Sequence, residues 1–194
     1  MKSLTILRHA KSGWDAPVER DFDRPINVRG RCGAELMGDY WKKSGWPLDW
    51  IIASPAVRVT ETLDHFQPAA GLADMEPHWE RRVYLASAAT LLDVVREAGA
   101  LGDHLMLVGH NPGLEDLAMM LVPFDPANKG RVALEEKLPT ASLVRITFNI
   151  AAWADLSERS GTLDTFVRPR DLDPALVRRW IRAVSDLAAP DQPL

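Results

Sequence analysis

Arginine and histidine side chains follow the ends of predicted strands at three places in the chain. Arg8 and His9 come directly after the apolar run Ser3 to Leu7, Arg58 lies shortly after the end of the next clear strand, and His110 ends a third. Two guanidinium groups and two imidazoles around one crevice suit a tetrahedral, doubly charged oxyanion. The spacing therefore predicts a site that handles phosphate.

The elements that position these side chains alternate between strand and helix. Apolar and β-branched runs predict strands over residues 3–7, 50–53, 105–110 and 142–148, with weaker ones at 75–79 and 162–167. Helical patterns cover about 27–43, 55–68, 88–98 and 172–188, and another helix follows Pro112. The alternation predicts an α/β fold, a three-layer α/β/α sandwich with a mainly parallel central sheet. Ligands bind beyond the carboxyl ends of the strands in such sheets, where Arg8, His9 and His110 stand.

Two of the predicted turns have the same design. Ser54 is a good N-cap with Pro55 at the first helical position, and Asn111 and Pro112 repeat that arrangement. We expect both helix N-termini to point at one crevice, where free backbone N–H groups favour an anion. Arg58 lies about one turn into its helix and can curl back toward that crevice; the alternative is a solvated surface arginine. Gly113 is expected to let a ligand approach the backbone closely.

Composition bounds the class of protein. The chain has 194 residues, 46% hydrophobic and 26% charged, which predicts one globular domain spanning residues 1–194. A formal net charge of -4 argues against a general nucleic-acid surface, and no apolar run has the length of a membrane helix. The N-terminus lacks the pattern of a signal peptide, and the single cysteine suits a reducing compartment. These features predict a cytoplasmic protein that binds neither nucleic acid nor membrane.

Two segments have no clear periodic pattern. Residues 123–139 combine proline, glycine and charged residues and are predicted to form a long loop, with a possible role as the rim of the site. Residues 189–194 are predicted to be a loose tail.

The ordered set of motifs resembles the histidine phosphatase (phosphoglycerate mutase-like) superfamily, and within it the small SixA-type phosphohistidine phosphatases. The motifs are Leu7-Arg8-His9-Ala10, Ser54-Pro55 with Arg58, Val108-Gly109-His110-Asn111-Pro112, and Leu138-Pro139-Thr140. The resemblance implies that His9 is the nucleophile that accepts the phosphoryl group. It also implies that Arg8, Arg58 and His110 hold the phosphate oxygens.

General chemistry supports these roles. His9 must present an unprotonated nitrogen to phosphorus, and the charge of Arg8 disfavours the protonated ring. The other ring nitrogen should then donate to a backbone carbonyl, which orients the ring. Charge in the transition state spreads over the equatorial oxygens, where preformed cations act best.

The sequence departs from the wider superfamily at the general acid. Acid phosphatases carry Asp directly after the second histidine, and here that position is Asn111, whose amide cannot act as an acid. Mutase-type members use a glutamate from the middle of the chain, and Glu80 is the candidate for that role; the alternative is a solvated residue beside Arg81 and Arg82. A weak or missing general acid favours a phosphoramidate such as phosphohistidine over an alkyl ester.

Further side chains are candidates for binding the substrate. Lys11, Ser12 and Asn111 lie beside the two histidines, and Arg24 follows the first loop, where the alternative is a surface salt bridge. His65, His78 and His104 do not have the spacing of a metal site, so neither a metal nor another cofactor is predicted.

Three classes of function remain open at this stage. The favoured one is a metal-independent phosphatase that works through a phosphohistidine intermediate, acting on a phosphohistidine protein or on a small phosphorylated metabolite. A phosphoglycerate mutase is less favoured, because the chain is short and lacks a clear acid. The third is a non-catalytic phosphate-binding module, which does not need an imidazole placed for attack.

Overall fold

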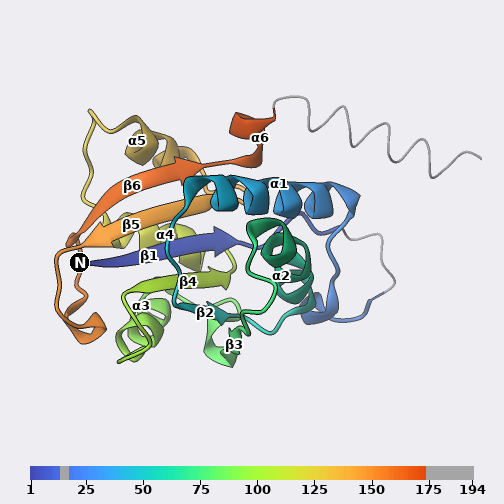
Figure 1. Cartoon of the computed structure of the whole chain (residues 1–194), viewed down its shortest axis with the longest axis horizontal. Helices are drawn as coiled ribbons and strands as arrows, with labels where there is room; N and C mark the ends of the chain where they lie inside the picture. The colour runs from blue at the N-terminus through green and yellow to red at the C-terminus, as the bar shows by residue number, and fades with distance from the viewer. Residues whose placement is uncertain (14–17, 174–194) are drawn as a thin grey trace, which may run out of the picture.

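The computed structural model describes residues 1–13 and 18–173. Its strands alternate with helices along most of the chain (Figure 1). The strands are β1 (Lys2–Arg8), β2 (Trp50–Ala53), β3 (His78–Trp79), β4 (His104–Gly109), β5 (Leu143–Phe148) and β6 (Gly161–Val167). The helices are α1 (Val28–Ser44), α2 (Val57–Ala70), α3 (Ala88–Arg96), α4 (Gly113–Leu121), α5 (Lys129–Glu136) and α6 (Pro169–Leu172). Short 3₁₀ helices are η1 (Asp21–Asp23), η2 (Arg81–Val83) and η3 (Trp153–Asp155).

Within the described residues, six strands form one sheet in the order β3-β2-β4-β1-β5-β6. The pairs β2 with β3, β2 with β4, and β1 with β4 are parallel, whereas β5 runs antiparallel to both β1 and β6. The prediction of a mainly parallel sheet is therefore confirmed: among the described strands only β5 runs against the others, and it makes the two antiparallel pairs. The weak strand predicted at 75–79 is reduced to two residues.

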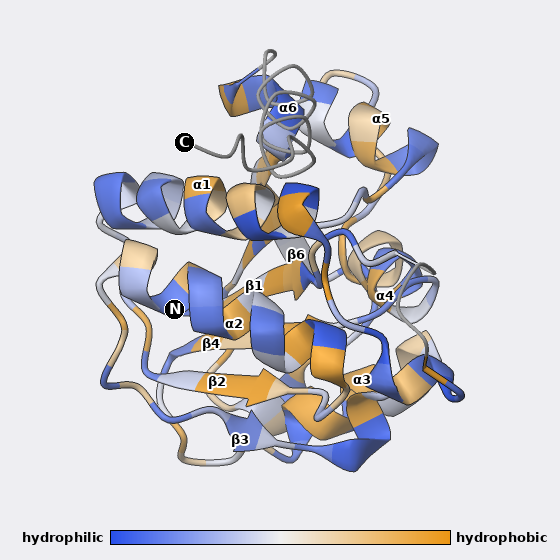
Figure 2. Cartoon of the chain, turned by 90° about the vertical axis from the view of Figure 1, so that its right-hand side faces the viewer, coloured by the Kyte–Doolittle hydropathy of each residue, from blue (hydrophilic) through white to orange (hydrophobic). Residues whose placement is uncertain are grey.

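Hydrophobic clusters on the two faces of the sheet give the three layers. Alternate residues of β4 point to opposite faces: Leu105 and Leu107 pack with α3 and α4, whereas Met106 and Val108 pack with α1 and α2. In Figure 2, β2 inside the sheet is largely coloured as hydrophobic, whereas β3 at its edge is not. No helix in the described part of the chain has the length and apolar character needed to cross a membrane.

The helix α1 forms as its sequence predicts. The Asn27 side chain accepts a hydrogen bond from the Gly30 backbone N–H at 3.0 Å, which satisfies one of the free donors at the N-terminus. Gly45 ends the helix with a φ of 63°, a left-handed conformation that suits glycine. Gly71 ends α2 in the same way, with a φ of 74°.

The predicted caps of α2 and α4 are wrong. Ala56 is the N-cap residue of α2 and Pro112 that of α4, so neither Ser54 nor Asn111 caps a helix. Both side chains are instead hydrogen-bonded across the fold, to His110 and to the Leu138 carbonyl respectively. The space beside Gly113 is taken by protein: a Cβ there would lie 2.0 Å from the Ala86 carbonyl oxygen, so this glycine allows close packing of two backbone segments.

The segment 123–139, predicted as a long loop, contains the helix α5. Asn128 caps it by accepting a hydrogen bond from the Arg131 N–H, and Leu134 is fully buried against the core. Tertiary contacts thus stabilise a helix in a segment whose local sequence pattern is weak. Of the predicted closing helix 172–188, only Leu172 and Asp173 lie within the described residues; the rest, and the predicted tail 189–194, lie outside them.

The parallel register brings the ends of three strands to one edge of the sheet. Arg8 at the end of β1 is paired with Gly109 at the end of β4. Beyond the strands, the His9 N–H donates to the Gly109 carbonyl at 3.1 Å, and the Ser54 N–H donates to the Val108 carbonyl at 3.0 Å. The residues that follow β1, β2 and β4 therefore start from fixed positions close to one another.

Candidate active site

His9 presents one nitrogen to a cavity at the carboxyl edge of the sheet. Its Nδ1 lies 2.8 Å from the Ala10 carbonyl oxygen. A carbonyl can only accept, so Nδ1 carries the proton and Nε2 is the unprotonated nitrogen. The Ala10 backbone is held in turn, because its N–H donates to the Thr62 hydroxyl at 2.9 Å. The orientation expected of this ring is thus present.

The cavity has a volume of about 320 Å³ and is strongly cationic. Arg8, Arg24, Arg58 and Lys11 line it together with His9. The remaining lining residues are Ser12, Asp21, Leu85 and Thr140. The structure therefore brings Arg8, Arg58, Arg24, Lys11 and Ser12 to one cavity, as the sequence predicts, and suits it to an oxyanion.

Two carbonyl oxygens and one carboxylate hold the guanidinium groups. Arg8 donates from one nitrogen to the Leu138 carbonyl at 2.7 Å. Arg58, with only 4% of its side chain exposed, donates to the Asp21 carbonyl at 2.6 Å and to the Asp21 carboxylate at 2.8 Å. These contacts preorganise positive charge, so little reorganisation is needed when an anion binds.

His110 lies behind His9, with the two ring centroids 5.2 Å apart. Its Nε2 is 2.8 Å from the Ser54 hydroxyl oxygen, and Tyr84 packs edge-on against the ring. Its Nδ1 is buried and has no hydrogen-bond partner in the described part of the chain. A buried polar atom without a partner is costly, and His110 itself is not among the residues that line the cavity.

The comparisons with known proteins bear on this arrangement. No family model matches the chain. An uncharacterised protein of Mycobacterium tuberculosis is 31% identical over 169 residues, which cover 84% of this chain and 100% of the relative. An uncharacterised chloroplast protein of Arabidopsis thaliana is 32% identical over 128 residues, or 62% of this chain and 59% of that protein.

Solved structures that are similar to this chain indicate its family. A protein of Agrobacterium tumefaciens, provisionally described as the phosphohistidine phosphatase SixA, superposes with a TM-score of 0.70 at 28% identity over 87% of this chain and 99% of that one. The chain belongs to the histidine phosphatase superfamily. A mycobacterial glucosyl-3-phosphoglycerate phosphatase, at 16% identity and a TM-score of 0.60 over 85% of this chain and 98% of its own, shares the fold.

In this histidine phosphatase, Glu80 is not among the described residues that line the cavity containing His9. Glu80 lies in a different cavity, with Ile52, His78, Arg82 and Glu97. Its carboxylate accepts hydrogen bonds from the Arg82 side chain and backbone, both at 2.9 Å, and these lower its pKa. The structure therefore places Glu80 with Arg82 and outside the cavity that contains His9, and its role as general acid stays a prediction.

Asn111 holds the cavity wall and does not line it. Its Nδ2 donates to Glu115 at 2.9 Å and to the Leu138 carbonyl at 3.1 Å. Glu115 also accepts the Leu138 N–H at 2.6 Å, so both residues fix the loop that carries Thr140. The structure places Asn111 in this supporting position, and substrate binding by Asn111 stays a prediction.

Three residues of this phosphatase site escaped the sequence reasoning. Asp21 accepts hydrogen bonds from Arg58, from Tyr84 at 2.9 Å and from Arg24 at 3.1 Å, and it joins the cations of the cavity. Partial burial acts to raise the pKa of Asp21, but hydrogen bonds from Tyr84 and the charge of Arg58 outweigh it and lower the pKa. The Asp21-x-x-Arg24 spacing was the available signal. Ser54, first interpreted as a cap, and Tyr84 both contact His110.

Both histidines are neutral at ordinary pH. Burial, together with the charge of Arg58, lowers the pKa of His9 to about 3 and that of His110 to about 2. The exposed fraction of His9 is 7%, and that of His110 is 2%. In an unfolded chain each would bind a proton near pH 6.5, so unfolding takes up protons below that pH and stability falls.

This linkage predicts a pH dependence of stability. Between pH 7.5 and 5.5 the free energy of unfolding should fall by about 2 to 3 kcal/mol from these two histidines together. Urea denaturation at the two pH values measures it. His110→Asn should remove about half of the loss, whereas the exposed His78→Gln should leave it unchanged. An equal loss in wild type and His110→Asn would contradict the assignment.

Proposed function

We propose that this phosphatase works without a metal ion, through a phosphohistidine intermediate on His9, and that a phosphohistidine protein is its first candidate substrate. The observation that carries the proposal is the His9 ring. Its Nδ1 is tied to the Ala10 carbonyl, which leaves Nε2 unprotonated at the wall of a cavity lined by Arg8 and Arg58.

The reaction has two displacements. In the first, the His9 Nε2 lone pair forms a bond to phosphorus, and the leaving group departs with the electrons of its own bond to phosphorus. In the second, water attacks the same phosphorus, the N–P bond breaks, and inorganic phosphate and the free imidazole result. The Ala10 carbonyl stabilises the positive charge that the phosphorylated ring carries at Nδ1–H.

The surrounding side chains stabilise the transferred group. Arg8 and Arg58 supply fixed positive charge for the equatorial oxygens, and Lys11 and Arg24 extend it around the cavity. If the Ser54 hydroxyl donates to Nε2 of His110, the buried Nδ1 carries a proton and becomes a donor to a phosphate oxygen.

The lack of a general acid in the cavity shapes the choice of substrate. Asp21 is the one carboxylate among its lining residues, and its lowered pKa keeps it ionised. A phosphoramidate nitrogen leaves readily once protonated by solvent, so phosphohistidine suits this site. A small phosphorylated metabolite with a good leaving group is the second candidate, favoured by a basic cavity beside the site.

Hydrolysis of p-nitrophenyl phosphate in the presence of EDTA tests the metal-independent mechanism. Because arginine side chains already supply the positive charge, turnover should persist in a large excess of chelator. Vanadate should inhibit, since it adopts the trigonal bipyramidal geometry of the transition state. Loss of turnover with EDTA and its return with Mg²⁺ or Zn²⁺ would refute this part of the proposal.

A further inference from the structure

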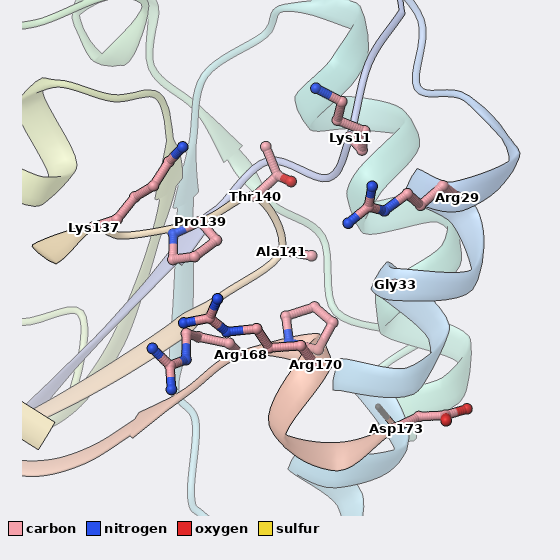
Figure 3. A pocket seen from close by; sticks show the side chains of 11 residues that line it. Lys11, Arg29, Gly33, Lys137, Pro139, Thr140, Ala141, Arg168, Arg170 and Asp173 are labelled. Atoms are coloured by element: carbon pink, nitrogen blue, oxygen red, sulfur yellow. The ribbon is translucent and has the colours of Figure 1, made fainter. Parts of the chain in front are cut away.

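A second cavity of about 230 Å³ lies beside the one that contains His9. Lys11 and Thr140 line both cavities, so the two cavities are adjacent. The second cavity lies between the start of α1, the loop before β5 and the start of α6 (Figure 3). Its lining residues are Lys11, Arg29, Gly33, Lys137, Pro139, Thr140, Ala141, Arg168, Pro169, Arg170 and Asp173.

Positive charge dominates this cavity. Figure 3 shows Lys11 and Arg29 on one side of it and Lys137 and Arg168 on the other, with Arg170 near Arg168. Arg168 is engaged by a carboxylate, because it forms an ion pair with Asp171 at 2.8 Å.

Lys11, Arg29 and Lys137 have no carboxylate partner among the described residues, whereas Arg170 lies close enough to Asp171 for its charge to help lower the Asp171 pKa. Within residues 1–13 and 18–173, no side-chain hydrogen bond or ion pair joins Lys11, Arg29, Lys137 or Arg170 to another residue. Asp173 is the single carboxylate among the lining residues, and in Figure 3 its oxygens point away from the other side chains.

Lys11, Arg29 and Lys137, which have no carboxylate partner among the described residues, repel one another, and a bound anion relieves that repulsion. Pro139, Ala141 and Pro169 add apolar wall, so the cavity can also hold the carbon skeleton to which an anionic group is attached. A phosphate ester carries nearly two negative charges and several acceptor oxygens, which matches several unpaired cations better than one carboxylate does.

We propose that this cavity binds a second phosphate group of the substrate, while the phosphoryl group to be transferred lies at His9. The substrate class is then a small organic molecule with at least two phosphate groups. This inference rests on the catalysis proposed at His9, and of the two candidate substrates above it selects the small phosphorylated metabolite. Lys11 and Thr140, shared by both cavities, lie where the two phosphates of one molecule are connected.

Binding to the His9→Ala protein tests the inference without requiring turnover. Isothermal titration calorimetry would compare fructose 1,6-bisphosphate with fructose 6-phosphate, a pair that shares a sugar and differs by one phosphate. The bisphosphate should bind at least about tenfold more tightly, as expected for a few charge-assisted hydrogen bonds partly screened by solvent.

The cations are then removed in the same His9→Ala background. Arg29→Ala combined with Arg170→Ala should bring the ratio of the two affinities close to one. Arg31→Ala is the matched control, because Arg31 is an exposed arginine on the same helix as Arg29 and does not line the cavity. It should keep the full ratio, and circular dichroism would verify that each variant is folded.

Equal affinities for the two sugars, or a bisphosphate advantage that survives the double substitution, would overturn the inference. So would a loss of the advantage in Arg31→Ala as well. Failure of the proposed function itself has a different signature, which is wild-type protein that does not hydrolyse p-nitrophenyl phosphate. Tight binding of a phosphohistidine protein with equal sugar affinities would assign the site to a macromolecular substrate instead.

Discussion

Replacing His9 by alanine should abolish turnover, lowering kcat by at least about 10⁴-fold, as removal of a covalent nucleophile does in other enzymes. The reason is that no other described side chain in the cavity offers an unprotonated imidazole nitrogen. Phosphate binding should survive in part, because Arg8 and Arg58 keep their hydrogen bonds to Leu138 and Asp21. Steady-state assays and phosphate titration separate the two effects.

Trapping the intermediate makes the same prediction more specific. Wild-type protein mixed with a ³²P-labelled substrate and quenched in alkali should carry label that is lost in acid, as expected of an N–P bond. His9→Ala should carry none, and His65→Ala should behave as wild type, because His65 is on α2, contacts Glu35 and does not line the cavity. Near-normal turnover or labelling of His9→Ala would place the nucleophile elsewhere.

The second large effect concerns the leaving group. We expect kcat/KM for simple alkyl phosphates to be at least about 10³-fold below that for p-nitrophenyl phosphate, within the usual contribution of a general acid. Asn111 cannot donate a proton as an acid, Glu80 lies in another cavity, and Asp21 is held ionised by its cationic partners. Rates over a series of phenyl and alkyl phosphates, plotted against the pKa of the leaving group, measure this dependence.

Glu80→Gln is the matched test of this explanation. It removes a carboxylate without changing its size, and both substrate classes should react within about twofold of wild type, as for surface substitutions away from a site. Alkyl phosphates that react as fast as activated ones in wild type, and stop reacting in Glu80→Gln, would make Glu80 a general acid. The enzyme would then be an ordinary phosphomonoesterase.

The sequence by itself determined the frame that carries the site. Apolar strands followed by Arg8, His9 and His110 are local patterns. In the parallel topology that these patterns imply, the carboxyl ends of the strands lie at one edge of the sheet, so the three residues lie near one another. The capped helix α1 was likewise readable, because Asn27 and Gly45 act through hydrogen bonds and dihedral angles within a few residues.

Only the tertiary structure decided which polar side chains meet in the cavity. Asp21 is 37 residues from Arg58 and 63 from Tyr84 along the chain, and no local pattern reports contacts at that separation. Ser54 followed by Pro55 is a local pattern that predicts a helix N-cap. In the fold its hydroxyl reaches His110, which comes from a neighbouring strand.

A local contact accounts for the position of Glu80, whereas contacts distant in sequence assemble the basic cavity. Glu80 and Arg82 are close in sequence and pair locally, which draws the carboxylate away from the histidines. The cations of the second cavity come from the first loop, α1, the segment after α5 and the start of α6. Packing of α1 and of the segment after α5 brings them together, because Ala34, Met37 and Leu138 are buried in the core.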